Sequence, residues 1–275
     1  MKLEMRTFER DTLHAVVKGR ALWLLHAVAN ALLIVAFFYW TRIPEATGLQ
    51  FTLTIVSGLM IAFATLWLHS TTFDYFYSAE KSLKESLRRS YVCIAAFLVW
   101  ALLFGLGLWC IGQLGDYSEQ TGGWSRHSLP GFARHSVTPR STFSATSWLL
   151  WFVYFFFWPI LLLPVGAQVA AKNFRGFYSA AAFRPIRDLR FWVVYAICFV
   201  VGAYLPYRLV WITPTRPSAL NTQTWSMVVR FGVGYLLMVT AWLVLCAAIT
   251  AASTGAAEVG FESPEPIAVA PMGSR

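Results

Sequence analysis

The sequence predicts an all-α polytopic membrane protein with six transmembrane helices. Three observations lead to this fold class: the composition, the presence of six long apolar stretches, and the distribution of the basic residues. Of the 275 residues, 57% are hydrophobic and 13% are charged, whereas about a quarter of a soluble domain is charged. Too few charged side chains remain to cover a water-exposed surface of this size.

Six apolar stretches each reach the roughly 20 residues that an α-helix needs to cross the hydrocarbon core. The first follows a basic segment, as a signal peptide would, but its apolar run continues to Trp40, beyond the length of a signal-peptide hydrophobic region. We therefore expect a retained helix. The predicted spans are residues 21–40, 50–70, 91–113, 148–171, 191–212 and 231–253, which together form one transmembrane domain over residues 1–253.

The basic residues lie mainly on one side of the predicted membrane. Of the 22 Lys and Arg residues, 15 fall in the N-terminal segment, the second and fourth connecting segments and the tail, and 7 fall on the opposite side. Cytoplasmic loops carry the excess of Lys and Arg in membrane proteins. We therefore expect a multi-pass protein of the plasma membrane with both termini in the cytoplasm.

The spans pair into three hairpins, and a basic amphipathic segment precedes each odd-numbered span, at residues 12–20, 82–89 and 180–190. Such a segment can form an interfacial helix, with its leucines in lipid and its basic side chains at the phosphates. The alternative is that every cytoplasmic loop is simply basic and the hairpins are not repeats. The residues expected to contact anionic lipid headgroups are Lys84, Arg88, Arg89, Arg184, Arg187 and Arg190.

Two of these segments have a recognisable sequence. Residues 82–90 read Ser-Leu-Lys-Glu-Ser-Leu-Arg-Arg-Ser and enter the third span, and residues 182–192 end in a basic–aromatic–Trp sequence. In both respects the chain resembles a broad group of bacterial six-span proteins. That group includes the YciC-like inner-membrane proteins and the membrane domain attached to some glycerophosphodiester phosphodiesterases. The resemblance implies the architecture and a bacterial inner membrane, and it implies no catalytic residue.

The sequence contains none of the common motifs of membrane enzymes. It has no HExxH motif, Walker A loop or clustered histidine boxes, so we expect no catalytic activity, no metal and no cofactor. The net charge of +9 sits beside apolar spans, which favours lipid over nucleic acid as the partner. The cysteines lie inside the apolar spans without a CxxC pair, which is typical of packing residues: Cys93, Cys110, Cys198 and Cys246.

The best polar constellation inside the spans is His26 with Asn30, one helical turn apart on one face of the first span. His69 ends the second span, and the topology places it on the same side as His26. One interpretation is that the two imidazoles bind a haem or a metal. The interpretation we favour is that His26 and Asn30 hydrogen-bond across a helix interface while His69 lies among the headgroups.

Kinks in the later spans suggest transport as an alternative. Pro159 and Pro164, followed by Gln168, interrupt the fourth span, and Pro206 interrupts the fifth. Broken helices can build a binding site at the midplane, to which Asn30 would add an amide. However, membrane helices also use proline for packing alone. Coupled carriers usually bury acids, and all 13 acids lie outside the predicted spans.

Two segments outside the spans are predicted to be polar. The outer loop, residues 114–147, has an Arg-His pair at 126–127 that is repeated at 134–135. These pairs suit an anionic headgroup or a metal, but a flexible polar loop explains them equally well. The tail, residues 254–275, is rich in Pro, Glu and small residues and is predicted to be disordered and cytoplasmic.

The sequence as a whole favours a non-enzymatic membrane bundle that contacts lipid or serves as an accessory to a membrane-protein partner. The first alternative is an uncoupled permease for a small molecule or a lipid. The second is a haem- or metal-binding membrane protein that uses His26 and His69.

Overall fold

The structure, a computed structural model, describes residues 12, 16–44, 46–78, 82–117, 120, 123–124, 127–131, 138–212 and 220–254. Within these residues all regular structure is helical, and six helices are long and apolar enough to cross a membrane. The predicted all-α polytopic fold is thereby confirmed. The tail beyond Thr254 and several residues of the outer loop, including 126 and 134–135, lie outside the described residues.

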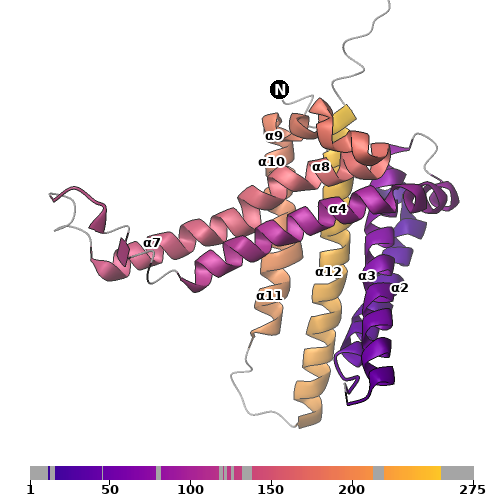
Figure 1. Cartoon of the computed structure of the whole chain (residues 1–275), viewed down its shortest axis with the longest axis horizontal. Coiled ribbons are helices and arrows are strands. Elements are labelled where there is room, and N and C mark those ends of the chain that lie inside the picture. Colours follow the sequence, from indigo (N-terminus) through magenta and orange to yellow (C-terminus); the bar gives the residue numbers. More distant parts are fainter. Residues whose placement is uncertain are drawn as a thin grey trace, which may run out of the picture.

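The spanning helices follow one another along the chain (Figure 1). The first three are α2 (Arg20–Trp40), α3 (Gly48–Tyr77) and α4 (Leu83–Asp116). The fourth consists of α7 (Pro139–Phe152), the π-helical turn η1 (Val153–Phe157) and α8 (Trp158–Lys172). The fifth consists of α10 (Leu189–Phe199), the π-helical turn η4 (Val200–Tyr204) and α11 (Leu205–Val210), and the sixth is α12 (Leu220–Thr254). Between α8 and α10 lie three short elements, η2 (Asn173–Tyr178), η3 (Ala180–Phe183) and α9 (Arg184–Arg187).

Capping side chains fix where several helices begin. Thr47 and Gln50 form a capping box at the start of α3, in which each side chain accepts a hydrogen bond from the other residue's backbone N–H. Asp188 caps α10 by accepting from the backbone N–H of Arg190 at 3.0 Å. Thr138 caps α7 in the same way. These caps satisfy N–H groups that the helices themselves leave unpaired.

Several helices are longer than the predicted spans. α3 continues past residue 70 to Tyr77, and α4 begins at Leu83 rather than at residue 91. The predictions were set by apolarity, which determines where hydrocarbon ends and does not determine where a helix ends. The added turns of α3 contain polar residues such as Thr71, Thr72 and Asp74, which are buried against neighbouring helices.

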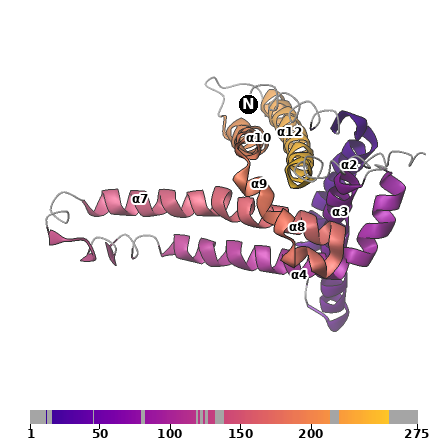
Figure 2. The ribbon, with the colours of Figure 1, turned by 90° about the horizontal axis from the view of Figure 1, so that it is seen from above.

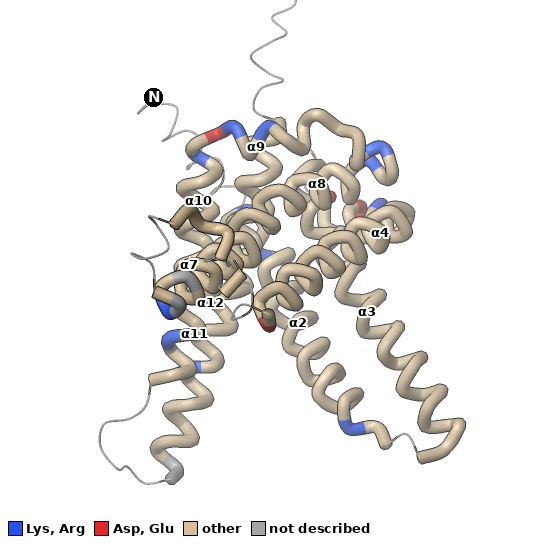
Figure 3. Tube along the Cα trace, turned by 60° about the vertical axis from the view of Figure 1, so that its left-hand side comes forward, with Lys and Arg blue, Asp and Glu red and all other residues tan. Residues whose placement is uncertain are grey.

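The six helices form three hairpins that diverge from one end of the molecule (Figures 1 and 3). We call this the convergent end; there the end of α3, the start of α4, the end of α8, α9, the start of α10 and the end of α12 come together. The hairpin of α4 with α7–α8 runs steeply across the others. In Figure 2 it lies lengthwise, whereas α10 and α12 are seen nearly end-on and α2 and α3 are seen obliquely.

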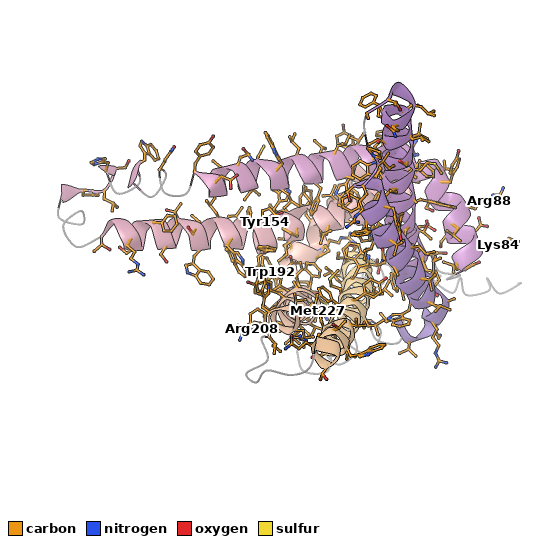
Figure 4. All side chains as sticks on the ribbon, turned by 90° about the horizontal axis from the view of Figure 1, so that it is seen from below. Lys84, Arg88, Tyr154, Trp192, Arg208 and Met227 are labelled. Atoms are coloured by element: carbon orange, nitrogen blue, oxygen red, sulfur yellow. The ribbon has the colours of Figure 1, made fainter. Side chains whose placement is uncertain are left out.

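The segments predicted as interfacial helices take different forms. Residues 82–89 belong to α4 itself, but its first turns, which carry Lys84 and Arg88, point away from the rest of the helix (Figure 4). Before the fifth span, η3 and α9 form separate short helices. Before the first span, residues 16–18 are helical and Gly19 forms a turn, while part of the predicted segment lies outside the described residues.

The core is concentrated at the convergent end. Its largest fully buried side chains include Phe73, Phe97, Phe191 and Ile160, which come from α3, α4, α10 and α8. α12 is the central element, because it packs against α2, α3, α8, α10 and α11. Half of its most apolar window is buried, a larger share than in any other spanning helix described.

α4 and α8 interlock through two tryptophans that lie against glycines. Trp158 of α8 lies on Gly107, and its Nε1 donates to the carbonyl of Phe104 at 3.0 Å. Trp100 of α4 lies on Gly166 in the reciprocal arrangement, and its Nε1 also donates to a backbone carbonyl of the facing helix, at 2.9 Å. Small residues let helices approach closely in a membrane, and here they make room for an indole.

Gly107→Ala is expected to destabilise the protein by about 1–3 kcal/mol, because the added Cβ would lie 1.9 Å from the Trp158 ring. Gly105→Ala is the matched control, since its Cβ would meet no neighbouring atom within 4 Å. That variant should be neutral or stabilised by up to about 1 kcal/mol through helix propensity. Unfolding in mixed micelles with increasing SDS, followed by circular dichroism, measures both. Equal stabilities would contradict the interlock.

Candidate functional site

The structure brings His26, Asn30 and His69 together near the convergent end. His26 is fully buried; its Nε2 is hydrogen-bonded to the hydroxyl of Thr72, and the side-chain amide of Asn30 donates to its Nδ1 at 3.1 Å. The ring centroids of His26 and His69 are 5.6 Å apart. The pairing of His26 with Asn30 follows from their i, i+4 spacing, whereas Thr72, from α3, is a partner that the sequence did not indicate.

This geometry bears on the metal hypothesis. Both ring nitrogens of His26 are used in hydrogen bonds within the protein, which leaves neither free for a metal. Among the described residues, no group of three or more His, Cys, Asp or Glu side chains could hold a metal ion. His69 lies edge to face with Trp242 of α12 at 5.1 Å between ring centroids, so it is part of the helix packing.

A cavity of about 610 Å³ lies beside this cluster, between the first hairpin and the third. Asn30 and His69 line it from α2 and α3, while Tyr195, Tyr235 and Trp242 line it from α10 and α12. Among the described residues, its lining contains no Lys, Arg, Asp or Glu. It therefore suits an uncharged, apolar guest better than an ion.

A second cavity, of about 880 Å³, lies between α7–η1 and η4–α11. Its walls are largely aromatic, and Arg140 contributes one cation to the lining. Phe199, at the end of α10, lines both cavities. Its ring contacts the ring of Phe156 of η1, with 4.5 Å between the centroids. The Phe199 ring therefore lies between the two cavities.

The prolines predicted as pathway residues line neither of these cavities. Pro164 is buried within α8, and Pro206 is buried at the start of α11, directly after η4 in the chain. Pro159 has no N–H to donate, so the carbonyl of Phe155 four residues earlier lacks its usual helical donor. The hydroxyl of Tyr195 donates to that carbonyl at 2.7 Å. In the described structure these prolines therefore belong to helix packing.

Gln168 is a buried connector. Its side chain is fully buried, and its amide N–H donates to the hydroxyl of Tyr77. Its amide oxygen accepts from the hydroxyl of Ser179 at 3.1 Å. Gln168 thus ties α8 to the end of α3 and to the segment that leads into the fifth span.

An ion pair at the junction of α3 and α4, between a buried carboxylate and a half-exposed arginine, is not among the predicted features. The sequence reasoning placed every acid outside the spans, but α3 continues through Asp74, which is 7% exposed. The Arg89 Nε lies 3.3 Å from its carboxylate, and an Arg89 N–H also donates to the hydroxyl of Ser78 at 2.8 Å. The sequence feature that could have predicted this pair is an acid and a base on opposite sides of a short connection between two long helices.

The basic residues predicted to contact headgroups all lie at the convergent end (Figures 3 and 4). Arg89 is paired with Asp74, Arg190 is paired with Asp188 at 3.0 Å, and Arg184 donates to the carbonyl of Ser253. Lys84, Arg88, Arg184 and Arg187 are exposed and form no ion pair with another described residue; three of them, Lys84, Arg88 and Arg187, also have no hydrogen bond to another described residue.

Comparisons of the chain with protein-family models, curated proteins and solved structures find no match. Function is therefore inferred from geometry and chemistry alone.

Arg89→Gln is expected to destabilise the protein by about 1–2 kcal/mol, because it leaves a buried carboxylate without its partner while the arginine itself is partly screened by solvent. Arg88→Gln removes the neighbouring exposed charge and should change stability by no more than about 0.5 kcal/mol. Unfolding in SDS micelles measures both. Adding Asp74→Asn to Arg89→Gln should recover part of the loss. Equal effects at positions 88 and 89 would argue against the ion pair.

Proposed function

We propose that the protein is a non-enzymatic bundle of the bacterial inner membrane that binds anionic lipid headgroups at its convergent end. The observation that carries the proposal is the gathering of Lys and Arg residues there, from helices far apart in the sequence (Figure 3). The acids at the same end are partly neutralised within the protein, since Asp74 and Asp188 each pair with an arginine. A net positive surface remains.

The physical basis is the potential of an anionic leaflet, which attracts each nearby Lys or Arg by about 1 kcal/mol. Lys84 and Arg88 are well placed for this role, because they project outward from the first turns of α4 (Figure 4). The positive-inside rule supports a cytoplasmic position for this end, and with it for both termini.

The proposal that the protein is not an enzyme rests on how its polar groups are used. His26, Asn30 and Thr72 bind one another, and Gln168 binds two hydroxyls. Groups held in this way position helices rather than a reacting substrate. The flanks of the diverging hairpins are apolar and exposed, which suits either lipid or a membrane-protein partner for which this chain is an accessory.

Replacing Lys84, Arg88 and Arg187 together by Gln is expected to lower the enrichment of phosphatidylglycerol around the protein severalfold, since three favourable charge contacts are removed. The measurement is the ratio of phosphatidylglycerol to phosphatidylcholine that co-purifies from mixed vesicles, determined by mass spectrometry.

The matched control replaces Arg42, Arg140 and Arg208 by Gln, because these are exposed cations away from the convergent end. Its lipid ratio should stay close to that of the unmodified protein. Equal losses of phosphatidylglycerol enrichment in the two triple variants would mean that enrichment depends only on the net charge of the protein. A ratio equal to that of the bulk vesicle for the unmodified protein would refute the proposal.

A second candidate function is uncoupled passage of a lipid or apolar molecule, which the two cavities on either side of Phe199 favour. Phe199→Ala removes the ring between them and should raise the rate at which a fluorescent lipid changes leaflets in reconstituted vesicles. Phe143→Ala, which changes only the second cavity, is the control. If vesicles containing either variant behave like protein-free vesicles, passage is excluded.

A further inference from the structure

The cavity between the first and third hairpins has the size of a small-molecule site. Its volume of about 610 Å³ lies within the range of about 300–1,000 Å³ that is typical of ligand pockets. Residues of α2 and α3 form one side, and residues of α10, η4 and α12 form the other. The space is partly open between the hairpins, where Ile34 and Phe37 are exposed, and ligand binding there does not depend on headgroup binding at the convergent end.

The lining selects an uncharged ligand with a flat apolar surface. In the part of the chain that the structure describes, no Lys, Arg, Asp or Glu side chain lines the cavity, so a charged guest would lose its hydration without compensation. Five aromatic side chains contribute to the walls, and such rings favour a planar guest through stacking and edge contacts. They are Phe37, Tyr195, Phe199, Tyr235 and Trp242.

Most hydroxyl groups in the lining already have partners. Tyr195 donates to the carbonyl of Phe155, and Tyr235 donates to the carbonyl of Ala27 at 2.5 Å. Thr65 donates to a carbonyl of its own helix. These groups therefore have little hydrogen-bonding capacity left for a ligand.

His69 and Trp242 differ from the other lining residues. The Nδ1 of His69 and the Nε1 of Trp242 are buried, and neither has a hydrogen-bond partner among the described residues. Buried polar nitrogens normally form hydrogen bonds, because a buried N–H or nitrogen lone pair without a partner destabilises the protein. Here two such nitrogens occur on rings in direct contact, and both rings line the same apolar space.

The imidazole of His69 can present a nitrogen to the cavity without moving the backbone. A half-turn of the ring exchanges the positions of its nitrogens and carbons. The neighbouring His26 ring is held by Asn30 and Thr72 and cannot compete for the same partner. His69 is thus an available donor at the polar end of the space.

We propose that this cavity binds an uncharged, planar, lipid-soluble carbonyl compound, the chemistry of a membrane quinone. A carbonyl oxygen of the ligand accepts a hydrogen bond from the turned His69 ring, which lies against Trp242, and the ligand ring lies among the aromatic walls. The apolar side chains of α2, including Leu33 and Ile34, contact its hydrocarbon chain.

The experiment titrates the full-length protein, in phosphatidylcholine nanodiscs, with a decyl-chain benzoquinone. Binding is measured by the rise in unfolding temperature and by the quinone adduct in native mass spectra. His69→Phe keeps the ring and removes its nitrogens, so we expect about five- to tenfold weaker binding, the loss that corresponds to one hydrogen bond. A hydrocarbon analogue without carbonyls should bind the unmodified protein and His69→Phe equally weakly.

A steric variant keeps the proposal testable if His69→Phe folds poorly. Ile34→Trp places an indole at the cavity, and Ile55→Trp makes the same change on an exposed face of α3 that does not line it. We expect quinone binding to be lost only in Ile34→Trp. Unchanged affinity in both His69→Phe and Ile34→Trp overturns the proposal. So does equally tight binding of the hydrocarbon analogue, or a phospholipid that occupies the cavity and is not displaced by the quinone.

Discussion

Hydrogen bonds from aromatic side chains to backbone carbonyls of neighbouring helices recur throughout this protein, and the helix packing depends on them. A helical carbonyl has a second lone pair that can accept such a bond without breaking the helix. In hydrocarbon an indole N–H or phenol O–H has no water to bind, so an acceptor in the protein is strongly favoured. The orientation of each helix is therefore fixed by where its donor meets a carbonyl. The bonds join Trp100 to Leu162, Trp158 to Phe104, Tyr195 to Phe155 and Tyr235 to Ala27.

The features that sequence reasoning could predict are those encoded within one helix. Span length follows from local apolarity, and the pairing of His26 with Asn30 follows from a spacing of one turn. The ion pair of Asp74 with Arg89 is not predictable in this way, because polar residues end the apolar stretch that predicts the span while the helix itself continues through them. The helix continues because the convergent end gives these polar side chains partners of their own.

The cavities could not be predicted because they arise between helices that are distant in the sequence. The space beside His69 is bounded by residues of α2, α3, α10 and α12, and its existence depends on the angle at which the first and third hairpins diverge. The hydrophobic periodicity of a single helix carries no information about the angle between hairpins. The π-helical turns before Pro159 and Pro206 add to the difficulty, because each changes the face that the following residues present. The basic residues expected at the headgroups, by contrast, are predicted from charge alone.

The steep crossing of the hairpins has a consequence for the membrane itself. A flat bilayer whose normal follows α10 and α12 would hold the hairpin of α4 and α7–α8 far from upright (Figure 2). The length of these helices projected on the membrane normal thus depends on how widely the hairpins spread. Thicker bilayers favour upright helices and thinner ones favour tilted helices, at a modest cost for each ångström of mismatch. The spread of the hairpins, and with it the width of the spaces between them, is therefore coupled to the thickness of the surrounding lipid.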